Sequence, residues 1–331
     1  MVLSGVLLYA WKTNGYTDLY YLLLMILGAK GIPAKKIIKV YFVITTILLC
    51  ITVIASLTGY IDNLVYFQEE RRRRMAMGSV YPTDFAAHVF YGSLAYVFIR
   101  DEKIKWYDTV GILIIAGLTF WVTDARMNFL CSLLLVLGIC VYMVYRRKWK
   151  TNHEVDLPDW VVIILTVMPV LCAGGMLVLT LLFSQSSFLL RGCNKILNNR
   201  LYYGKLGIDW YGFTPWGQYI EMMGNGGSIE KKLYYFFIDS SYINGLLCWG
   251  VIAFVLILFV FFVICNKAAK NKKWIWLWVF VMFSIQCVIE HHMIEVAYNP
   301  FLWLFMAEWT GMEKREINRW RNEENGEKTK G

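Results

Sequence analysis

Charge is scarce in this chain of 331 residues: Asp, Glu, Lys and Arg together make up 17% of it, whereas soluble domains carry about 25%. Hydrophobic residues make up 58%, and the mean hydropathy is +0.48. So little polar surface excludes a soluble globular enzyme, and the same composition excludes a disordered chain or a coiled coil. We therefore predict an all-α polytopic integral membrane protein, with residues 1–331 forming a single membrane domain.

Several motifs are missing as well. The sequence has no CxxC pair, and only Cys193 of its eight cysteines lies outside the apolar runs and their ends, which excludes a disulfide framework and a redox motif. No glycine-rich phosphate loop is present, so nucleotide binding is unsupported. No cleavable signal peptide is evident. The net charge of +9 resides in loops between apolar runs, which indicates control of topology and not nucleic-acid binding.

What the sequence does contain is a series of long, continuous apolar runs. Backbone groups in lipid must be hydrogen-bonded within the protein, so these runs predict helices and not the alternating strands of a barrel. The first and the last runs are the shortest. We predict nine spanning helices, at residues 17–32, 37–60, 80–99, 107–123, 127–145, 160–184, 241–265, 274–291 and 296–310.

The distribution of Lys and Arg predicts the orientation of these spans. Positive residues favour the cytoplasmic side of a membrane, and 21 of the 33 Lys and Arg residues fall on one side of the predicted spans. That side includes residues 146–159 and the polar tail 313–331, which we therefore predict to be cytoplasmic. Residues 61–79 and the large loop 185–240 are then extracytoplasmic.

The two sides also differ in the type of cation. The predicted cytoplasmic side has 6 Arg and 15 Lys, and the opposite side has 7 Arg and 5 Lys. Lys is sufficient to set topology, whereas the planar guanidinium group of Arg binds phosphate oxygens in pairs. Four consecutive arginines, Arg71–Arg74, oppose the positive-inside tendency. We interpret them as ligands either of lipid headgroups or of an anionic substrate.

Aromatic residues are concentrated in the loop 185–240. Such residues commonly form a belt at the membrane interface. Tyr and Trp are also rigid and amphipathic, suited to stacking on sugars, which makes Tyr202 and Trp216 candidate binding residues. In the same loop, residues 193–206 have the pattern of an amphipathic helix that lies on the membrane.

Ionisable residues near or inside predicted spans are costly to bury and are therefore candidates for function. Asp84 and His88 lie four residues apart on one helix face, where a structural pair and a proton-handling pair are both consistent with the spacing. Arg126 follows Asp124 in a very short loop, and Asp239 lies where the large loop returns to the membrane. The structural alternatives are an ion pair between Arg126 and either aspartate, and a helix cap at Asp239.

The sequence EHHMIE at residues 290–295 ends the eighth predicted span. On a helix, His291 and His292 would each lie about one turn from Glu295, which places an imidazole beside a carboxylate as in an oriented general base. A metal site is the alternative, since His and Glu bind zinc, although the spacing matches no metalloprotease signature. We expect no metal, with His291 or His292 as the candidate base.

Taken together and in order, these segments resemble the Wzy-type polysaccharide polymerases of the O-antigen polymerase and ligase superfamily, in the form found with capsule and exopolysaccharide genes of Gram-positive bacteria. Each segment is a weak signal alone, but their order and shared predicted side make the likeness specific. The resemblance covers about residues 17–310 and rests on RMAMG at 74–78, YPTDF at 81–85, TDAR at 123–126, NRLY at 199–202, YG at 211–212, WG at 216–217, DSSY at 239–242, Glu290, and AYNPF at 297–301.

The resemblance implies a GT-C-like glycosyltransferase of the bacterial cytoplasmic membrane with an extracytoplasmic active site. It would transfer a growing glycan from undecaprenyl pyrophosphate to the next lipid-linked repeat unit, without a metal or nucleotide. Arg74, Arg126 and Arg200 are implied as diphosphate ligands, without a cofactor. The implied base is of the histidine type, which His291 or His292 matches, and Glu290 competes because relatives have a Glu-led segment here. We add Asp84 and Asp239 as candidate substrate-binding residues. The implied partners are the lipid-linked oligosaccharide and the lipid bilayer, with a flippase and a chain-length regulator as further candidates. Relatives commonly have additional spans before the position of residue 1, so the chain is expected to be short or to start late.

Three other functions compete with this one. A transporter or flippase of the lipid-linked sugar typically has paired halves and charges at mid-membrane, whereas this sequence has no internal repeat. A membrane O-acyltransferase of surface glycans would require a group fed by a cytoplasmic acyl donor, and His153 is the only histidine on the predicted cytoplasmic side. A lipid-binding scaffold is the non-catalytic alternative.

Overall fold

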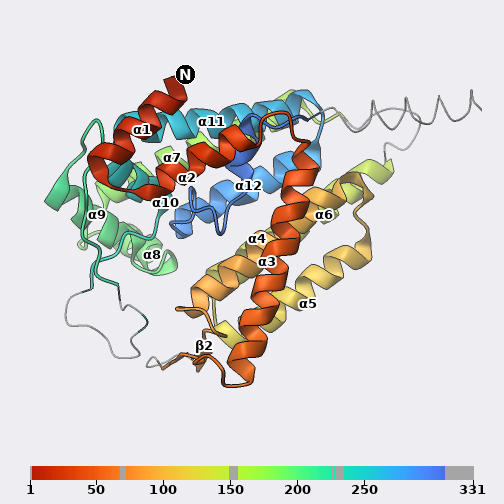
Figure 1. The fold of residues 1–331 in the computed structure, drawn as a ribbon, viewed down its shortest axis with the longest axis horizontal. Helices are drawn as coiled ribbons and strands as arrows, with labels where there is room; N and C mark the ends of the chain where they lie inside the picture. Colours follow the sequence, from red (N-terminus) through yellow and green to blue (C-terminus); the bar gives the residue numbers. More distant parts are fainter. Residues whose placement is uncertain (1, 68–71, 149–155, 225–226, 228–234, 310–331) are drawn as a thin grey trace, which may run out of the picture.

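The computed structural model describes residues 2–67, 72–148, 156–224, 227 and 235–309, and most of these residues are helical. Arg71, His153 and the predicted cytoplasmic tail 313–331 lie outside the described residues. The main helices, most of them labelled in Figure 1, are α1 (Val2–Asn14), α2 (Thr17–Gly28), α3 (Ala34–Leu57), α4 (Pro82–Arg100), α5 (Trp106–Thr123), α6 (Arg126–Lys148), α7 (Asp159–Leu182), α8 (Phe188–Ile196), α9 (Arg200–Tyr211), α10 (Ser241–Asn244), α11 (Val251–Lys270) and α12 (Trp274–Ile289).

Five of these helices, α3, α5, α6, α7 and α11, are long and apolar enough to cross a membrane. The apolar helices α2 and α12 are shorter. A helix needs about 20 residues to cross the hydrocarbon core, so the five long helices agree with the predicted class, an all-α membrane protein. They are fewer than the nine predicted spans.

The last predicted span, 296–310, is wrong for the residues that the structure describes. Pro300 has no N–H to donate, and the side-chain oxygen of Asn299 accepts a hydrogen bond from the Phe301 N–H at 2.9 Å. These contacts favour a turn, and only a short 3₁₀ helix, η3 (Phe301–Phe305), follows. The apolar composition therefore reflects burial inside the protein and not a crossing of the membrane.

The predicted span 241–265 is interrupted. A π-helical segment, η2 (Gly245–Trp249), separates α10 from α11, and Gly250 has a φ of +87°. Here two backbones cross: a Cβ atom on Gly250 would lie 2.1 Å from the backbone nitrogen of Gly217. Only glycine permits both this φ and this approach, so α11 begins at Val251.

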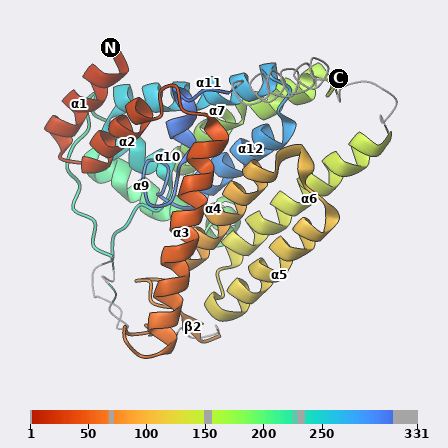
Figure 2. The same ribbon diagram turned by 45° about the vertical axis from the view of Figure 1, so that its right-hand side comes forward.

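Two groups of helices meet at α12 (Figures 1 and 2). In the first group α3 packs on α4, α4 on α5, and α5 on α6; in the second, α7 packs on α11, and α1 packs on α2 and α11. Helix α12 contacts α4 and α6 of the first group and α7 and α11 of the second, and most of its side chains are buried. The segment that follows its end at Ile289 is therefore held between the two groups.

The packing of α6 on α12 depends on a glycine. A Cβ atom at Gly138 would lie 2.1 Å from the Trp278 ring, whose Nε1 donates to the Leu135 carbonyl at 3.1 Å. Gly138→Ala should lower stability by about 1–3 kcal/mol through overpacking, seen as a lower thermal unfolding midpoint in detergent. Gly117→Ala is the matched control, because Gly117 on α5 has no neighbouring atom within 4 Å of the added Cβ. Equal midpoints for the two variants would contradict this packing.

Candidate functional site

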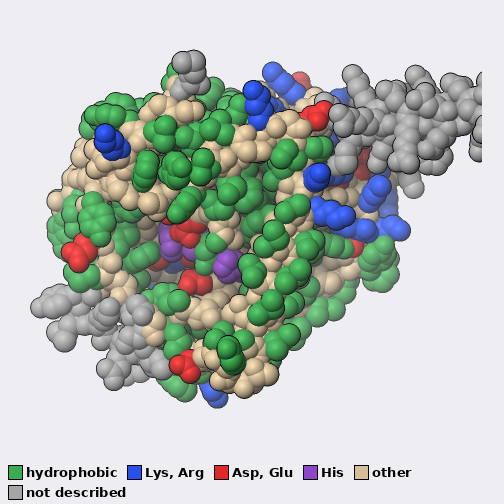
Figure 3. All heavy atoms as spheres, in the orientation of Figure 1, with side chains coloured by type: hydrophobic (Ala, Val, Ile, Leu, Met, Phe, Trp, Pro, Cys, Tyr) green, Lys and Arg blue, Asp and Glu red, His purple; other side chains and the backbone are tan. Residues whose placement is uncertain are grey.

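A polar cavity of about 640 Å³ lies beside the end of α12, between the two helix groups. Figure 3 shows acidic and histidine side chains inside a hollow next to the apolar side chains of α3. Eight of the ten residues that the sequence singles out line this cavity, although they come from segments far apart in the chain: Arg74, Asp84, Arg126, Arg200, Asp239, Glu290, His291 and His292.

The two aromatic candidates do not line the cavity. Tyr202 lies on α9 with its ring against Tyr203, at 5.2 Å between centroids, and Trp216 packs edge-on against Tyr9 at 4.6 Å. Both are used in packing of the large loop. Other aromatic residues of the described chain line the cavity instead, namely Tyr81, Tyr235, Phe237 and Tyr298.

Two of the arginines begin helices directly after left-handed residues. Asp124 has a φ of +47° and ends α5, so that Arg126 starts α6 two residues later. Asn198 and Asn199 are also left-handed, at +48° and +66°, and Arg200 is the first residue of α9. Asp and Asn tolerate this conformation better than other side chains. The single amphipathic helix predicted across the second turn is therefore wrong, and two helices, α8 and α9, take its place.

Arg74 and Arg126 approach the same corner of the cavity. Arg74 lies on the short strand β2 (Arg74–Met75), which pairs with β1 (Val65–Tyr66), and its Nε donates to the Thr123 carbonyl at 2.9 Å. Arg126 Nε lies 3.6 Å from Asp124 Oδ1, so the predicted ion pair is present. The Arg126 side chain is nevertheless 62% exposed, and at this distance the carboxylate leaves N–H groups of Arg126 able to meet a solute.

Arg200 is buried and surrounded by oxygen atoms. Its Nε donates to the Ile289 carbonyl and its Nη1 to the Leu197 carbonyl at 3.2 Å. Its Nη2 lies 3.7 Å from Glu290 Oε1 and 3.8 Å from Asp239 Oδ2. The guanidinium group is thus fixed by backbone carbonyls, and its outer edge faces two carboxyl groups of the cavity.

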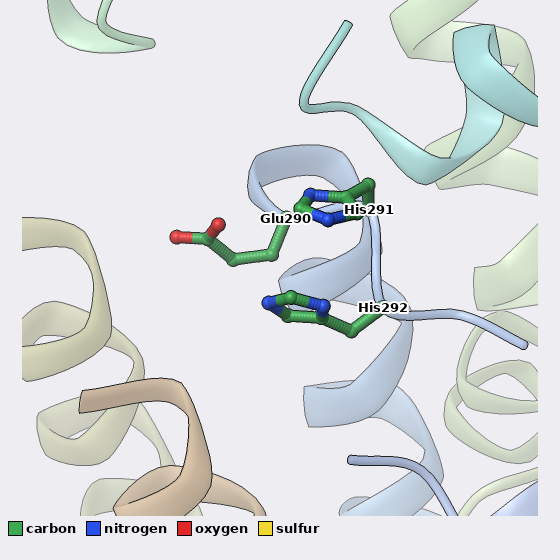
Figure 4. Close-up of side chains that lie close together, drawn as sticks. All are labelled: Glu290, His291 and His292. Carbon is green, nitrogen blue, oxygen red and sulfur yellow. The ribbon is translucent and has the colours of Figure 1, made fainter. Parts of the chain in front are cut away.

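The segment after α12 forms turns and not the helix assumed for the EHHMIE sequence, but the predicted histidine–carboxylate pairs are present. His291 Nε2 lies 3.2 Å from Glu295 Oε1, and His292 Nδ1 lies 2.9 Å from Glu295 Oε2. One carboxylate therefore holds both imidazoles, which Figure 4 shows one above the other beside the Glu290 side chain. When each ring donates to Glu295, the lone pairs remain on His291 Nδ1 and His292 Nε2, buried atoms with no hydrogen-bond partner among the described residues.

The protonation states distinguish these residues. Burial lowers the pKa of His291 to about 4 and that of His292 to about 3. Burial also raises the pKa of Glu290 to about 8, against the opposing effect of the Arg200 charge. Near pH 7 both imidazoles are therefore neutral, while Glu290 carries a proton. At this pH both histidines are in the form that accepts a proton, whereas Glu290 must first lose its own proton; the low pKa values also make the two imidazoles weak bases.

Replacing Glu290 by glutamine should flatten the pH dependence of stability. Because its pKa rises from 4.5 to about 8 on folding, folded Glu290 holds a proton that the unfolded chain releases, so stability falls as pH rises through this window. Between about pH 5 and pH 9, Glu290→Gln should lose less thermal stability in detergent than the wild type. Glu102→Gln, at a half-exposed position, should keep the wild-type slope. A wild-type slope in Glu290→Gln would show that its pKa is not raised.

The same cluster is where a metal ion would bind. One ligand atom each from Glu290, His291 and His292 lie within 4.8 Å of one another. Glu295 would then hold the outer nitrogens of the two imidazoles, as carboxylates commonly do behind metal-bound histidines. The geometry is thus suited both to a metal and to an oriented base, and chelation distinguishes the two.

Tyr298 and Asn128 are among the cavity residues to which no role was assigned from the sequence. Tyr298 stacks on His292 at 3.6 Å between centroids and on His88 at 3.9 Å. Asn128 accepts a hydrogen bond from Gln286 at 2.7 Å in the buried wall. A polar residue inside a predicted span was the available signal for Asn128, and Tyr298 lies in the AYNPF segment, although no role was assigned to it. His88 faces away from the cavity that Asp84 lines.

Fold and site together define a helical protein of the membrane type, in which fixed guanidinium groups share a cavity with an imidazole–carboxylate cluster. Comparison with protein-family models, with curated proteins and with solved structures gives no match for this chain. Its function is therefore argued from the site.

Proposed function

We propose that this protein is a Wzy-type polysaccharide polymerase of the bacterial cytoplasmic membrane, a GT-C-like and metal-independent glycosyltransferase. It transfers a growing glycan from undecaprenyl pyrophosphate to the next lipid-linked repeat unit. The observation that carries the proposal is that three arginines from distant segments and the histidine–glutamate cluster line one cavity. A diphosphate leaving group requires fixed positive charge, an acceptor hydroxyl requires a base, and the cavity offers both.

In this reaction the acceptor hydroxyl attacks the anomeric carbon of the donor glycan. A new C–O bond forms there as the C–O bond to the diphosphate breaks. Arg74, Arg126 and Arg200 stabilise the negative charge that builds on the departing diphosphate. Because the positions of Arg74 and Arg200 are fixed by backbone carbonyls, they need little rearrangement when the bond breaks.

We assign the base to His291. Its side chain is 27% exposed, whereas that of His292 is 2% exposed, so His291 is the imidazole that a substrate can touch. The proton of the acceptor hydroxyl passes to His291 Nδ1, because Nε2 is directed to Glu295. Nδ1 is buried without substrate, so the ring must shift for the acceptor hydroxyl to reach it. Glu295 and His292 act as positioning residues that fix the tautomer and the ring of His291.

The proposal places the cavity on the extracytoplasmic side. Cysteine replacements at Tyr219 of the large loop, which is 73% exposed, and at Asp156, whose side chain is 69% exposed, should report the two sides. In intact cells a membrane-impermeant maleimide should label Tyr219→Cys and not Asp156→Cys, with both labelled after permeabilisation. The opposite pattern would put the cavity on the side away from flipped repeat units.

The direct test is to supply the purified protein with a lipid-linked repeat unit. A ladder of glycans spaced by one repeat is expected, with the same yield in EDTA. Inactivation by EDTA and recovery with zinc would assign the cluster to a metal. Movement of the lipid-linked sugar between the leaflets of proteoliposomes, without a ladder, would assign transport instead. A flippase that delivers repeat units and a chain-length regulator are the proteins with which a polymerase would work.

A further inference from the structure

An apolar groove of about 960 Å³ runs along α3, next to the polar cavity. Its lining includes Ile37, Val40, Ile44 and Leu48 of α3, together with residues of α2 and of the segment 296–303. Val40, Ile44 and Leu48 are each more than half exposed. Since α3 lies at the edge of the molecule (Figures 1 and 2), the groove faces the bilayer along one side.

The groove and the polar cavity share a wall. His88 lines the groove, His292 lines the cavity, and the Tyr298 ring is stacked between the two imidazoles. Tyr41 lines the groove and donates its hydroxyl proton to the Tyr298 carbonyl. Val296 lines the groove, whereas its neighbour Glu295 lines the cavity. The apolar and the polar sites are therefore separated by one layer of side chains.

The length of the groove indicates what fits it. Its α3 lining extends from Pro33 to Thr52, which is about 28 Å at 1.5 Å per residue. A bilayer core is about 30 Å thick, so a phospholipid chain fills about 15 Å of it. The groove is thus about twice as long as one leaflet, and it matches a hydrocarbon chain that reaches across both.

We propose that this groove binds the long polyprenyl tail of the donor lipid while the diphosphate lies in the cavity against the arginines. This inference rests on the proposed function and deepens it. The cavity beside the groove has the positive charge that a diphosphate headgroup requires, and the groove has the apolar surface that its tail requires. The His88–Tyr298–His292 stack keeps the tail away from the reacting groups.

Crosslinking tests the location without requiring activity. The full-length protein is incubated with undecaprenyl diphosphate that carries a diazirine in its tail, and labelled peptides are identified by mass spectrometry. We expect labelling within residues 37–52 of α3 that excess undecaprenyl monophosphate suppresses. Labelling confined to other helices would overturn the proposal. So would labelling of α3 by a phospholipid that carries a diazirine, if excess undecaprenyl monophosphate does not reduce that labelling.

Two neighbouring threonines provide matched variants. Thr45 lines the groove and Thr46 does not, so Thr45→Trp should narrow the groove while Thr46→Trp leaves it open. Thr45→Trp should raise KM for an undecaprenyl-linked donor at least about tenfold, which is equivalent to losing the burial of about two methylene groups. The same variant should not raise KM for a farnesyl-linked donor. An equal effect of both variants, or of both donors, would reject the groove. Crosslinking of α3 in a protein that forms no ladder with either donor would reject the polymerase and retain the groove.

Discussion

Replacing His291 by alanine is expected to lower the rate of glycan transfer by about 10²–10⁴-fold, the usual effect of losing a general base. His291 is the more exposed of the two imidazoles and is held by Glu295 at 3.2 Å. Binding of the lipid-linked donor should change little, because the arginines that we propose as diphosphate ligands lie on other elements. Initial rates of ladder formation and binding of labelled donor measure the two effects separately.

His292→Gln is the comparison for this variant, because a glutamine amide retains a hydrogen-bond donor toward Glu295. It should reduce the rate far less than His291→Ala does, since His292 is buried and orients its neighbour without contacting substrate. Near-normal polymerisation by His291→Ala, together with an inactive His292→Gln or Glu290→Gln, would move the base to that residue.

Arg126→Lys should lower kcat/KM for the lipid-linked donor by about 10²-fold, within the range for loss of one donor to a developing charge. Lysine keeps the positive charge but loses the planar pair of N–H groups that binds two phosphate oxygens. Because the Arg126 side chain is 62% exposed and lies as far as 3.6 Å from Asp124, the substitution should leave folding intact. Steady-state kinetics and thermal unfolding in detergent measure both.

Arg191→Lys is the matched control. Arg191 lies on α8 and does not line the cavity, so its replacement should leave kcat/KM unchanged. Wild-type kinetics in Arg126→Lys, with an inactive Arg126→Ala, would mean that charge alone is needed and that no bidentate contact forms.

Hydropathy predicted most of the helices of this fold, because long apolar runs in lipid have few alternatives to a helix. It did not predict where α11 begins, since the break before Val251 depends on the contact of Gly250 with Gly217, which are far apart in sequence. Nor did it predict that much of 299–307 is buried against the rest of the protein. Apolar composition alone does not separate a lipid-facing helix from a protein-covered turn.

In the candidate site, too, some features could be predicted from local sequence and others depend on contacts between distant segments. Arg126 and Asp239 were identifiable because ionisable groups next to apolar runs are costly. That they meet Arg74 in one cavity depends on the tertiary packing around α12. Tyr202 and Trp216 were selected by residue type alone, and packing of Tyr202 on Tyr203 and of Trp216 on Tyr9 of α1 explains their positions equally well.

The single carboxylate shared by His291 and His292 limits how the cluster handles protons. Once His291 has taken a proton, Glu295 balances one positive charge, and the buried His292 has no second carboxylate among its hydrogen-bond partners in the described chain. The cluster then stores one proton and must release it before it can accept the next. Under the proposed mechanism, each added repeat unit is therefore coupled to the release of one proton from the cluster.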